Sequence, residues 1–167
     1  MTVKDYNIAV DNYADNIFRF VVKHLKNVDV AKDVVQDTFA KVWVKHKDIA
    51  AEKAKSYLFT TAYNTLIDVL RKEKYTVPID IGRETIDKHF SQGEIKNLDL
   101  QETLDNALDQ LPEIQRTVIL LRDYEGYDYA EIGKITKLKE SQVKVYIFRA
   151  RKKLKQILVS VEAVLEL

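Results

Sequence analysis

The sequence predicts an all-α protein with two small helical domains joined by a flexible linker, the second domain containing a helix-turn-helix. Only four Gly and two Pro occur among the 167 residues, which suits a largely helical chain. Apolar residues recur at helical spacing through most of the sequence. This spacing lapses between residues 73 and 97, where half of the Gly and half of the Pro fall. We therefore expect domains at 1–74 and 98–167, with a linker at 75–97.

The first domain is expected to contain three helices, at about 3–26, 29–46 and 56–72. Asp29 is a suitable N-cap for the second helix, whose apolar stripe runs on to Val42 and Trp43. Trp43 is predicted to anchor the core. The intervening segment 47–55 loses the periodicity and is interpreted as a loop. Within the linker, one turn of helix could form at about 84–90.

The second domain is expected to begin with a helix near residue 98. Pro112 suits the first position of the next helix, and Gly126 can adopt the positive φ that ends it. Asp128 and Glu131 have the spacing of a capping box at the start of a third helix. A tight turn at 136–138 then leads to a fourth helix from about residue 139. This succession of two short helices and a turn is typical of a helix-turn-helix.

Charge separates along the chain, although the total is only +1. Residues 132–167 contain nine Lys or Arg and three Asp or Glu, whereas residues 81–131 contain five and twelve. A basic C-terminal end predicts a nucleic-acid partner. A solvated Lys-rich helix would have a similar composition, but the helix-turn-helix spacing favours binding to duplex DNA. The expected DNA-facing residues of the last helix are Lys139, Ser141, Gln142, Lys144, Tyr146, Arg149, Lys152 and Lys153.

No pattern of catalytic or metal-binding residues stands out. The chain has no Cys, and His24, His46 and His89 lack ligand-like spacing to one another. Neither a Gly-rich phosphate loop nor a nucleophile motif occurs. The sequence has no signal-like N-terminal segment and no apolar run long enough to span a membrane. We expect no enzymatic activity, no cofactor, no membrane insertion and a cytoplasmic location, with His24 and His46 serving only the helix C-termini near which they lie.

Two stretches resemble a known family. The run LDQLPEIQRTVILLRDYEGYDYAEIGKITKLKESQVKVYIFRARKKL resembles region 4 of bacterial RNA polymerase sigma factors. The runs AKDVVQDTFAKVWVKH and AKSYLFTTAYNTLIDVLRKEK resemble region 2. With these two regions alone, the chain is similar to the extracytoplasmic-function (ECF) group. The resemblance implies a protein that binds core RNA polymerase, at the β′ clamp and β flap, and directs it to promoter DNA.

The resemblance also implies roles for residues of the first domain. In the second helix it implies contacts with core polymerase by Asp33, Val34, Gln36 and Asp37. Near the third helix it implies recognition and melting of the downstream (−10) element. There aromatic rings can stack on single-stranded bases and cations can follow phosphates, while core packing is an equally good reading of the two Tyr. The residues concerned are Lys53, Lys55, Ser56, Tyr57, Thr60, Thr61, Tyr63, Asn64, Arg71 and Lys72.

Some positions differ from the family pattern. Lys137 stands where the turn often has Gly, and Lys139 stands where a Ser usually caps the recognition helix. Val145 and Tyr146 replace a typical Ser-Arg pair, so no particular upstream (−35) sequence can be transferred, because Tyr cannot make the bidentate contact of Arg.

Three further points concern the function and partners of the chain. A stand-alone transcriptional regulator could use the same helix-turn-helix without binding core polymerase, but it would not need the region 2 block. The family commonly pairs with an anti-sigma factor, often membrane-linked, and the resemblance implies such a partner. The apolar tail at 156–167 could extend the last helix and pack on region 4, or it could dock a regulator or a second copy.

Overall fold

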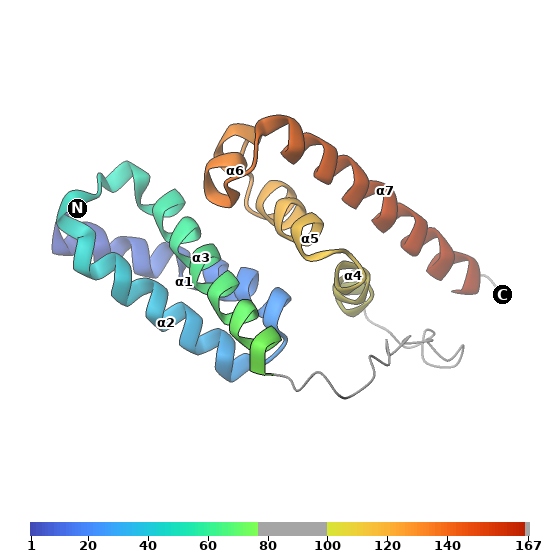
Figure 1. The fold of residues 1–167 in the computed structure, drawn as a ribbon, viewed down its shortest axis with the longest axis horizontal. Helices are drawn as coiled ribbons and strands as arrows, with labels where there is room; N and C mark the ends of the chain where they lie inside the picture. Colours follow the sequence, from blue (N-terminus) through green and yellow to red (C-terminus); the bar gives the residue numbers. More distant parts are fainter. Residues whose placement is uncertain (77–99, 166–167) are drawn as a thin grey trace.

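The computed structural model describes residues 1–76 and 100–165, and these ranges contain helices and no strand (Figure 1). The all-α prediction is confirmed. The predicted linker, apart from its first two residues, and the turn of helix expected at 84–90 lie outside the described residues. The α-helices are α1 (Val3–Leu25), α2 (Val28–Lys45), α3 (Ala54–Thr76), α4 (Leu100–Asp109), α5 (Glu113–Ile119), α6 (Tyr129–Thr136) and α7 (Glu140–Leu165).

Helices α1, α2 and α3 pack on one another and form the first half of the molecule. The N-cap of α2 is Asn27 and not Asp29, because the Asn27 side-chain oxygen accepts hydrogen bonds from the backbone N–H groups of Asp29 and Val30. Asp29 lies instead in the first turn, where the positive end of the helix dipole stabilises its carboxylate.

The segment predicted as a loop at 47–55 contains two short 3₁₀ turns, η1 (His46–Asp48) and η2 (Ala51–Lys53). The second turn leads directly into α3, which therefore starts at Ala54, two residues earlier than predicted. Helix α3 also continues four residues beyond the predicted end at residue 72 and reaches into the expected linker.

Trp43 is not the core anchor that the sequence predicted. It is 41% exposed, its ring stacks on His46 at 4.3 Å between centroids, and it meets Tyr6 edge-on at 4.9 Å. The buried stripe of α2 runs through Val34, Thr38 and Val42, so the neighbouring position 43 falls on the flank of the helix.

Helices α4 to α7 form the second half. Pro112 is the N-cap of α5 and not its first helical residue. Arg116 closes the preceding helix by donating hydrogen bonds to the carbonyl oxygens of Leu108, Asp109 and Leu111 at 3.0–3.1 Å. Helix α5 continues into a π turn, η4 (Leu120–Tyr124), and the chain then turns at Gly126 with φ of 75°. The predicted role of Gly126 is thus confirmed.

Helices α6 and α7 form the helix-turn-helix. The Asp128 carboxylate accepts a hydrogen bond from the Glu131 N–H, and the Glu131 carboxylate accepts one from the Asp128 N–H, so the predicted capping box is confirmed. Lys137 ends α6 in the left-handed region at φ of 60°, where Gly would be unstrained. Gly133 allows the turn to approach, since a Cβ there would lie 2.8 Å from the Leu138 carbonyl oxygen.

Helix α7 continues through the apolar tail to Leu165, as the first alternative for that segment expected. It packs on α4 and α5 as well as on α6. The two halves also touch, because α3 packs on α6 and α1 on α4 (Figure 1). Their buried residues form one continuous apolar cluster.

Candidate nucleic-acid interface

The exposed side of α7 carries a ridge directly opposite its buried residues Val143, Ile147 and Ala150. The ridge consists of four exposed residues spaced by four, three and four positions along the helix, Ser141, Val145, Phe148 and Lys152. Phe148 is 68% exposed and Val145 is 45% exposed. A helix that enters the major groove presents such a ridge to the base edges, and apolar side chains there can contact thymine methyl groups.

The sequence analysis did not name Val145 and Phe148, which the structure exposes on this ridge, and placed Tyr146 on the DNA-facing side. The structure places Tyr146 on the flank of α7, half-buried and packed against the core. The signal that could have identified the other two is their spacing, since Val145 lies four positions after Ser141 and Phe148 lies four positions before Lys152.

The cations of the recognition helix differ in their partners. The Lys144 ammonium lies 3.6 Å from a Glu140 carboxylate oxygen and 5.6 Å from the centre of the Tyr129 ring. Arg149, Lys152 and Lys153 are exposed. At the start of the helix, the Gln142 side-chain oxygen accepts a hydrogen bond from the Lys139 N–H at 2.9 Å. This bond is one half of a capping box, and the other half is absent because Lys139 has no side-chain acceptor for the Gln142 N–H.

A groove runs beside α3 and is lined by residues of α2, η2, α3 and α6. It brings together six of the ten residues predicted for the downstream element: Lys53, Ser56, Tyr57, Thr60, Thr61 and Asn64. Lys41 and Lys45 of α2 also line it, and the sequence analysis did not include them. The groove therefore combines an aromatic ring, an amide, hydroxyl groups and cations, which is the chemistry that holds single-stranded bases and phosphates.

The other four predicted residues lie outside this groove. Tyr63 is half-buried against the core, and burial raises the pKa of its hydroxyl. Arg71 and Lys72 are exposed near the end of α3. The Lys55 ammonium is directed to the second half, where it donates a hydrogen bond to the Glu125 carbonyl oxygen at 3.0 Å.

On α2, Asp33, Gln36 and Asp37 are exposed, as expected of a docking surface. Val34 differs from that expectation, because it is 2% exposed and lies in the core. It fixes the helix against its neighbours and offers no surface to a partner. The Asp37 carboxylate pairs with the Lys41 ammonium one turn later, at 2.8 Å.

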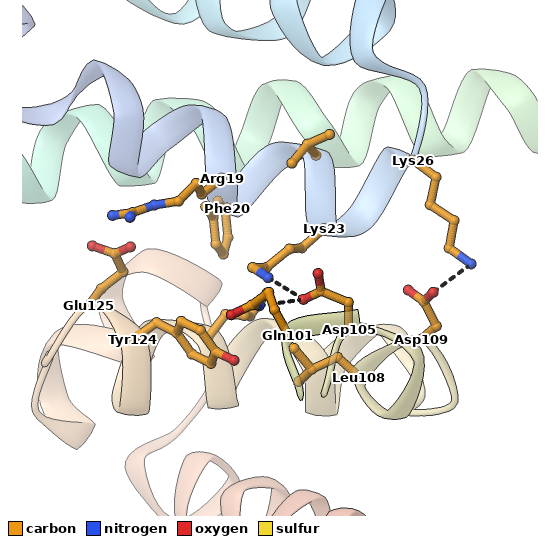
Figure 2. Close-up of a pocket in the computed structure, with 12 residues that line it drawn as sticks. Arg19, Phe20, Lys23, Lys26, Gln101, Asp105, Leu108, Asp109, Tyr124 and Glu125 are labelled. Atoms are coloured by element: carbon orange, nitrogen blue, oxygen red, sulfur yellow. Dashed lines mark hydrogen bonds and ion pairs between the residues drawn. The ribbon is translucent and has the colours of Figure 1, made fainter. Parts of the chain in front are cut away.

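Charged side chains join the two halves at the contact between α1 and α4 (Figure 2). Lys23 pairs with Asp105 at 2.6 Å and Lys26 with Asp109 at 3.1 Å. Arg19 and Glu125 face each other across the same cleft (Figure 2). The two ion pairs connect basic side chains at the end of α1 to the acidic segment at residues 81–131.

His24 lies buried between the halves, which its predicted role at a helix end did not foresee. Its Nδ1 is 2.8 Å from the Phe20 carbonyl oxygen, and its Nε2 is 2.9 Å from the Thr117 hydroxyl. Because a carbonyl only accepts, we assign the proton of the neutral ring to Nδ1. Burial lowers the pKa of His24 to about 4, a shift that the Phe20 carbonyl opposes and the nearby Arg116 charge reinforces.

Within residues 1–76 and 100–165, no group of His, Asp and Glu side chains is arranged to hold a metal ion. No helix in this part of the chain combines the length and apolar character needed to cross a bilayer.

Comparison with known proteins agrees with the two-part geometry. Residues 9–76 match the family model for sigma-70 region 2, and residues 101–154 match the model for sigma-70, region 4. The chain is 32% identical over 148 residues to RNA polymerase sigma factor SigV of Bacillus subtilis, covering 86% of this chain and 85% of SigV. It is 28% identical to the ECF RNA polymerase sigma factor SigM of the same organism, covering 87% of this chain and 90% of SigM.

A solved structure has a similar fold. The sigma factor RpoE from Bartonella quintana, in a co-crystal with the anti-sigma factor NepR, superposes with a TM-score of 0.73 at 26% identity. The match covers 93% of this chain and 98% of that one.

These findings define a helical transcription factor that combines a region 2 module with a region 4 helix-turn-helix. The chain belongs to the ECF group of RNA polymerase sigma factors. It therefore directs promoter-specific initiation by core RNA polymerase, and the stand-alone regulator is not favoured.

Proposed function

We propose that residues 1–74 bind core polymerase and open the downstream promoter element, and that residues 98–167 read the upstream element as duplex, with residues 75–97 as the connection. The observation that carries this division is the groove beside α3. It holds a mixed set of base-stacking, base-pairing and phosphate-binding groups in one half, while the exposed ridge of α7 lies in the other.

Within the groove, Tyr57 is suited to stack on an unpaired base and Asn64 to bond a base edge through its amide. The hydroxyl groups of Thr60 and Thr61 donate to the carbonyl oxygens of Ser56 and Tyr57 at 2.8 Å, but each hydroxyl oxygen retains acceptor capacity toward a base. The ammonium group of Lys53, together with those of Lys41 and Lys45, supplies phosphate contacts.

An open-complex assay tests this assignment. Polymerase reconstituted with Asn64→Ala should open a duplex promoter about five- to tenfold less well than wild type, as expected for the loss of one hydrogen bond of about 1 kcal/mol. Asn7→Ala removes the same group from an exposed position on α1 and serves as the matched control. Equal open-complex formation by the Asn64→Ala and Asn7→Ala proteins would contradict the assignment.

For core binding we propose that Asp33, Gln36 and Asp37 on the exposed face of α2 pair with cationic and polar groups of the β′ clamp, and that the second half contacts the β flap. For regulation we propose an anti-sigma factor, which could be membrane-linked. Its support is the resemblance to a sigma factor solved with such a partner. We further propose that the protein acts in the cytoplasm and catalyses no reaction of its own.

A further inference from the structure

A single lysine of α2 touches both the proposed core-docking residues and the groove beside α3. The Lys41 ammonium lies 2.8 Å from a carboxylate oxygen of Asp37, which is one turn earlier on the exposed face of α2. The same ammonium donates a hydrogen bond to the Thr65 hydroxyl of α3 at 3.1 Å. Lys41 and Thr65 both line the groove, as does Asn64. Lys41 therefore stands between the residue proposed to bind polymerase and the site proposed to bind DNA.

We propose that Lys41 serves these two surfaces in turn. In the free protein, Asp37 holds the Lys41 ammonium and partly neutralises it. When a cation of the β′ clamp pairs with Asp37, it competes for the carboxylate and repels the ammonium. Lys41 then turns to a phosphate of the single strand in the groove. This proposal rests on the proposed functions of Asp37 and of the groove.

The chemistry of the side chain allows such an exchange. An ammonium group has three N–H donors on a flexible stem, and Asp37 and Thr65 occupy two of them. The side chains of Lys41 and Asp37 are 49% and 52% exposed, so a partner can reach each of them. An exposed ion pair one helical turn apart contributes little to stability. A cation of the clamp and a phosphate of DNA can therefore replace this pair at little cost.

Thr65 keeps the ammonium on the groove side when Asp37 releases it. Thr65 is only 5% exposed, and its hydroxyl accepts the hydrogen bond from Lys41. Because a buried hydroxyl oxygen is stabilised by a donor, this bond favours the Lys41 conformation that points toward α3. Asn64 is the next residue along α3 and lines the same groove. The released charge of Lys41 therefore lies beside the strand whose base edge Asn64 is proposed to bond.

Lys45 provides a matched comparison for Lys41. It lies one turn later on α2, is exposed and lines the same groove. Within residues 1–76 and 100–165, Lys45 forms no ion pair with a carboxylate. Lys41→Gln and Lys45→Gln each remove one positive charge from the same wall of the groove. Only the first of them breaks a pair with Asp37.

Core affinity is measured by competition with the labelled wild-type protein for core polymerase. Lys41→Gln should bind core about twofold more tightly than Lys45→Gln, because Asp37 no longer leaves a helix-surface ion pair when it docks. In an Asp37→Asn background the two replacements should bind core equally, since no pair remains to be broken. Lys41→Arg keeps the charge that pairs with Asp37, so it should bind core as wild type does.

DNA binding is measured with holoenzyme and a labelled single-stranded oligonucleotide that carries the non-template downstream element of a promoter this protein transcribes. Each phosphate contact contributes about 0.7 to the slope of log affinity against log salt, so Lys41→Gln should lower this slope by about 0.7. Lys45→Gln should lower it by a similar amount. Lys41→Gln therefore strengthens core binding while it weakens DNA binding, a combination that a purely structural role of Lys41 would not produce.

Three results would overturn the proposal. The first is equal core affinity of Lys41→Gln and Lys45→Gln, and the second is an unchanged salt slope for Lys41→Gln. The third is a difference in core affinity that persists in the Asp37→Asn background, because the effect would then not pass through the ion pair. If wild-type holoenzyme does not bind the oligonucleotide, or if Asn64→Ala holoenzyme binds it equally well, the proposed function of the groove itself fails.

Discussion

Acidification should lower the unfolding free energy of the protein through His24. Burial lowers the pKa of His24 to about 4 from the ordinary value of 6.5. The folded chain therefore holds the neutral ring, and as pH falls the unfolded chain binds the proton first. The stabilisation from the neutral ring is therefore complete above pH 6.5 and is lost as pH falls from 6.5 toward 4. A shift of this size corresponds to about 3 kcal/mol of unfolding free energy across that interval.

The cause of the shift can be isolated with His24→Gln, which keeps a donor and an acceptor but does not titrate. Urea unfolding of both proteins, followed by helical circular dichroism at several pH values from 7 to 4, gives the two stability curves. Wild type should lose stability faster than the variant below pH 6.5, because only the wild type has His24 to protonate. Acidic groups titrate in both proteins, so their contribution cancels in the difference. Parallel curves between pH 6.5 and 4.5 would refute the reasoning.

Three further predictions concern the turn at Lys137, the upstream DNA contact of Phe148 and the core polymerase contact of Asp33. Lys137→Gly should raise the unfolding free energy by about 0.5–1 kcal/mol in urea denaturation, because Gly adopts the left-handed conformation at φ of 60° without strain; lower stability would contradict this. Replacing a thymine of the upstream element by deoxyuridine should weaken wild-type binding about fourfold where Phe148 covers the methyl group, and Phe148→Ala should abolish this difference in a binding titration; an unchanged difference would exclude the contact. Asp33→Lys should weaken binding to core polymerase about tenfold in a competition assay while duplex DNA binding is retained, and unchanged competition would remove Asp33 from the docking surface.

Local rules explain the parts of the fold that the sequence predicted well. The Asp128–Glu131 capping box and the positive φ of Gly126 depend on the chemistry of a few neighbouring residues, so they could be recognised without a structure. The helices themselves follow from apolar spacing. Asn27 was missed as a cap because Asn27 and Asp29 are both good N-caps, and only the hydrogen bonds distinguish them.

Contacts between the halves could not be predicted in this way. Tyr127, His24 and Lys55 each have an ordinary local interpretation, as a loop aromatic, a helix-end histidine and a DNA-binding cation. Their shared role at the contact depends on how α3 packs on α6 and α1 on α4, and a linker of the expected length permits many arrangements. Trp43 illustrates the same limit, since its exposure is decided by which side of α2 meets the neighbouring helices.

Run-off transcription tests the central claim most directly. Core polymerase from a related bacterium would be combined with a library of promoter fragments, with and without this protein. We predict transcripts that require the protein and that begin downstream of a shared pair of sequence elements. Binding to duplex fragments without any protein-dependent transcript would contradict the account.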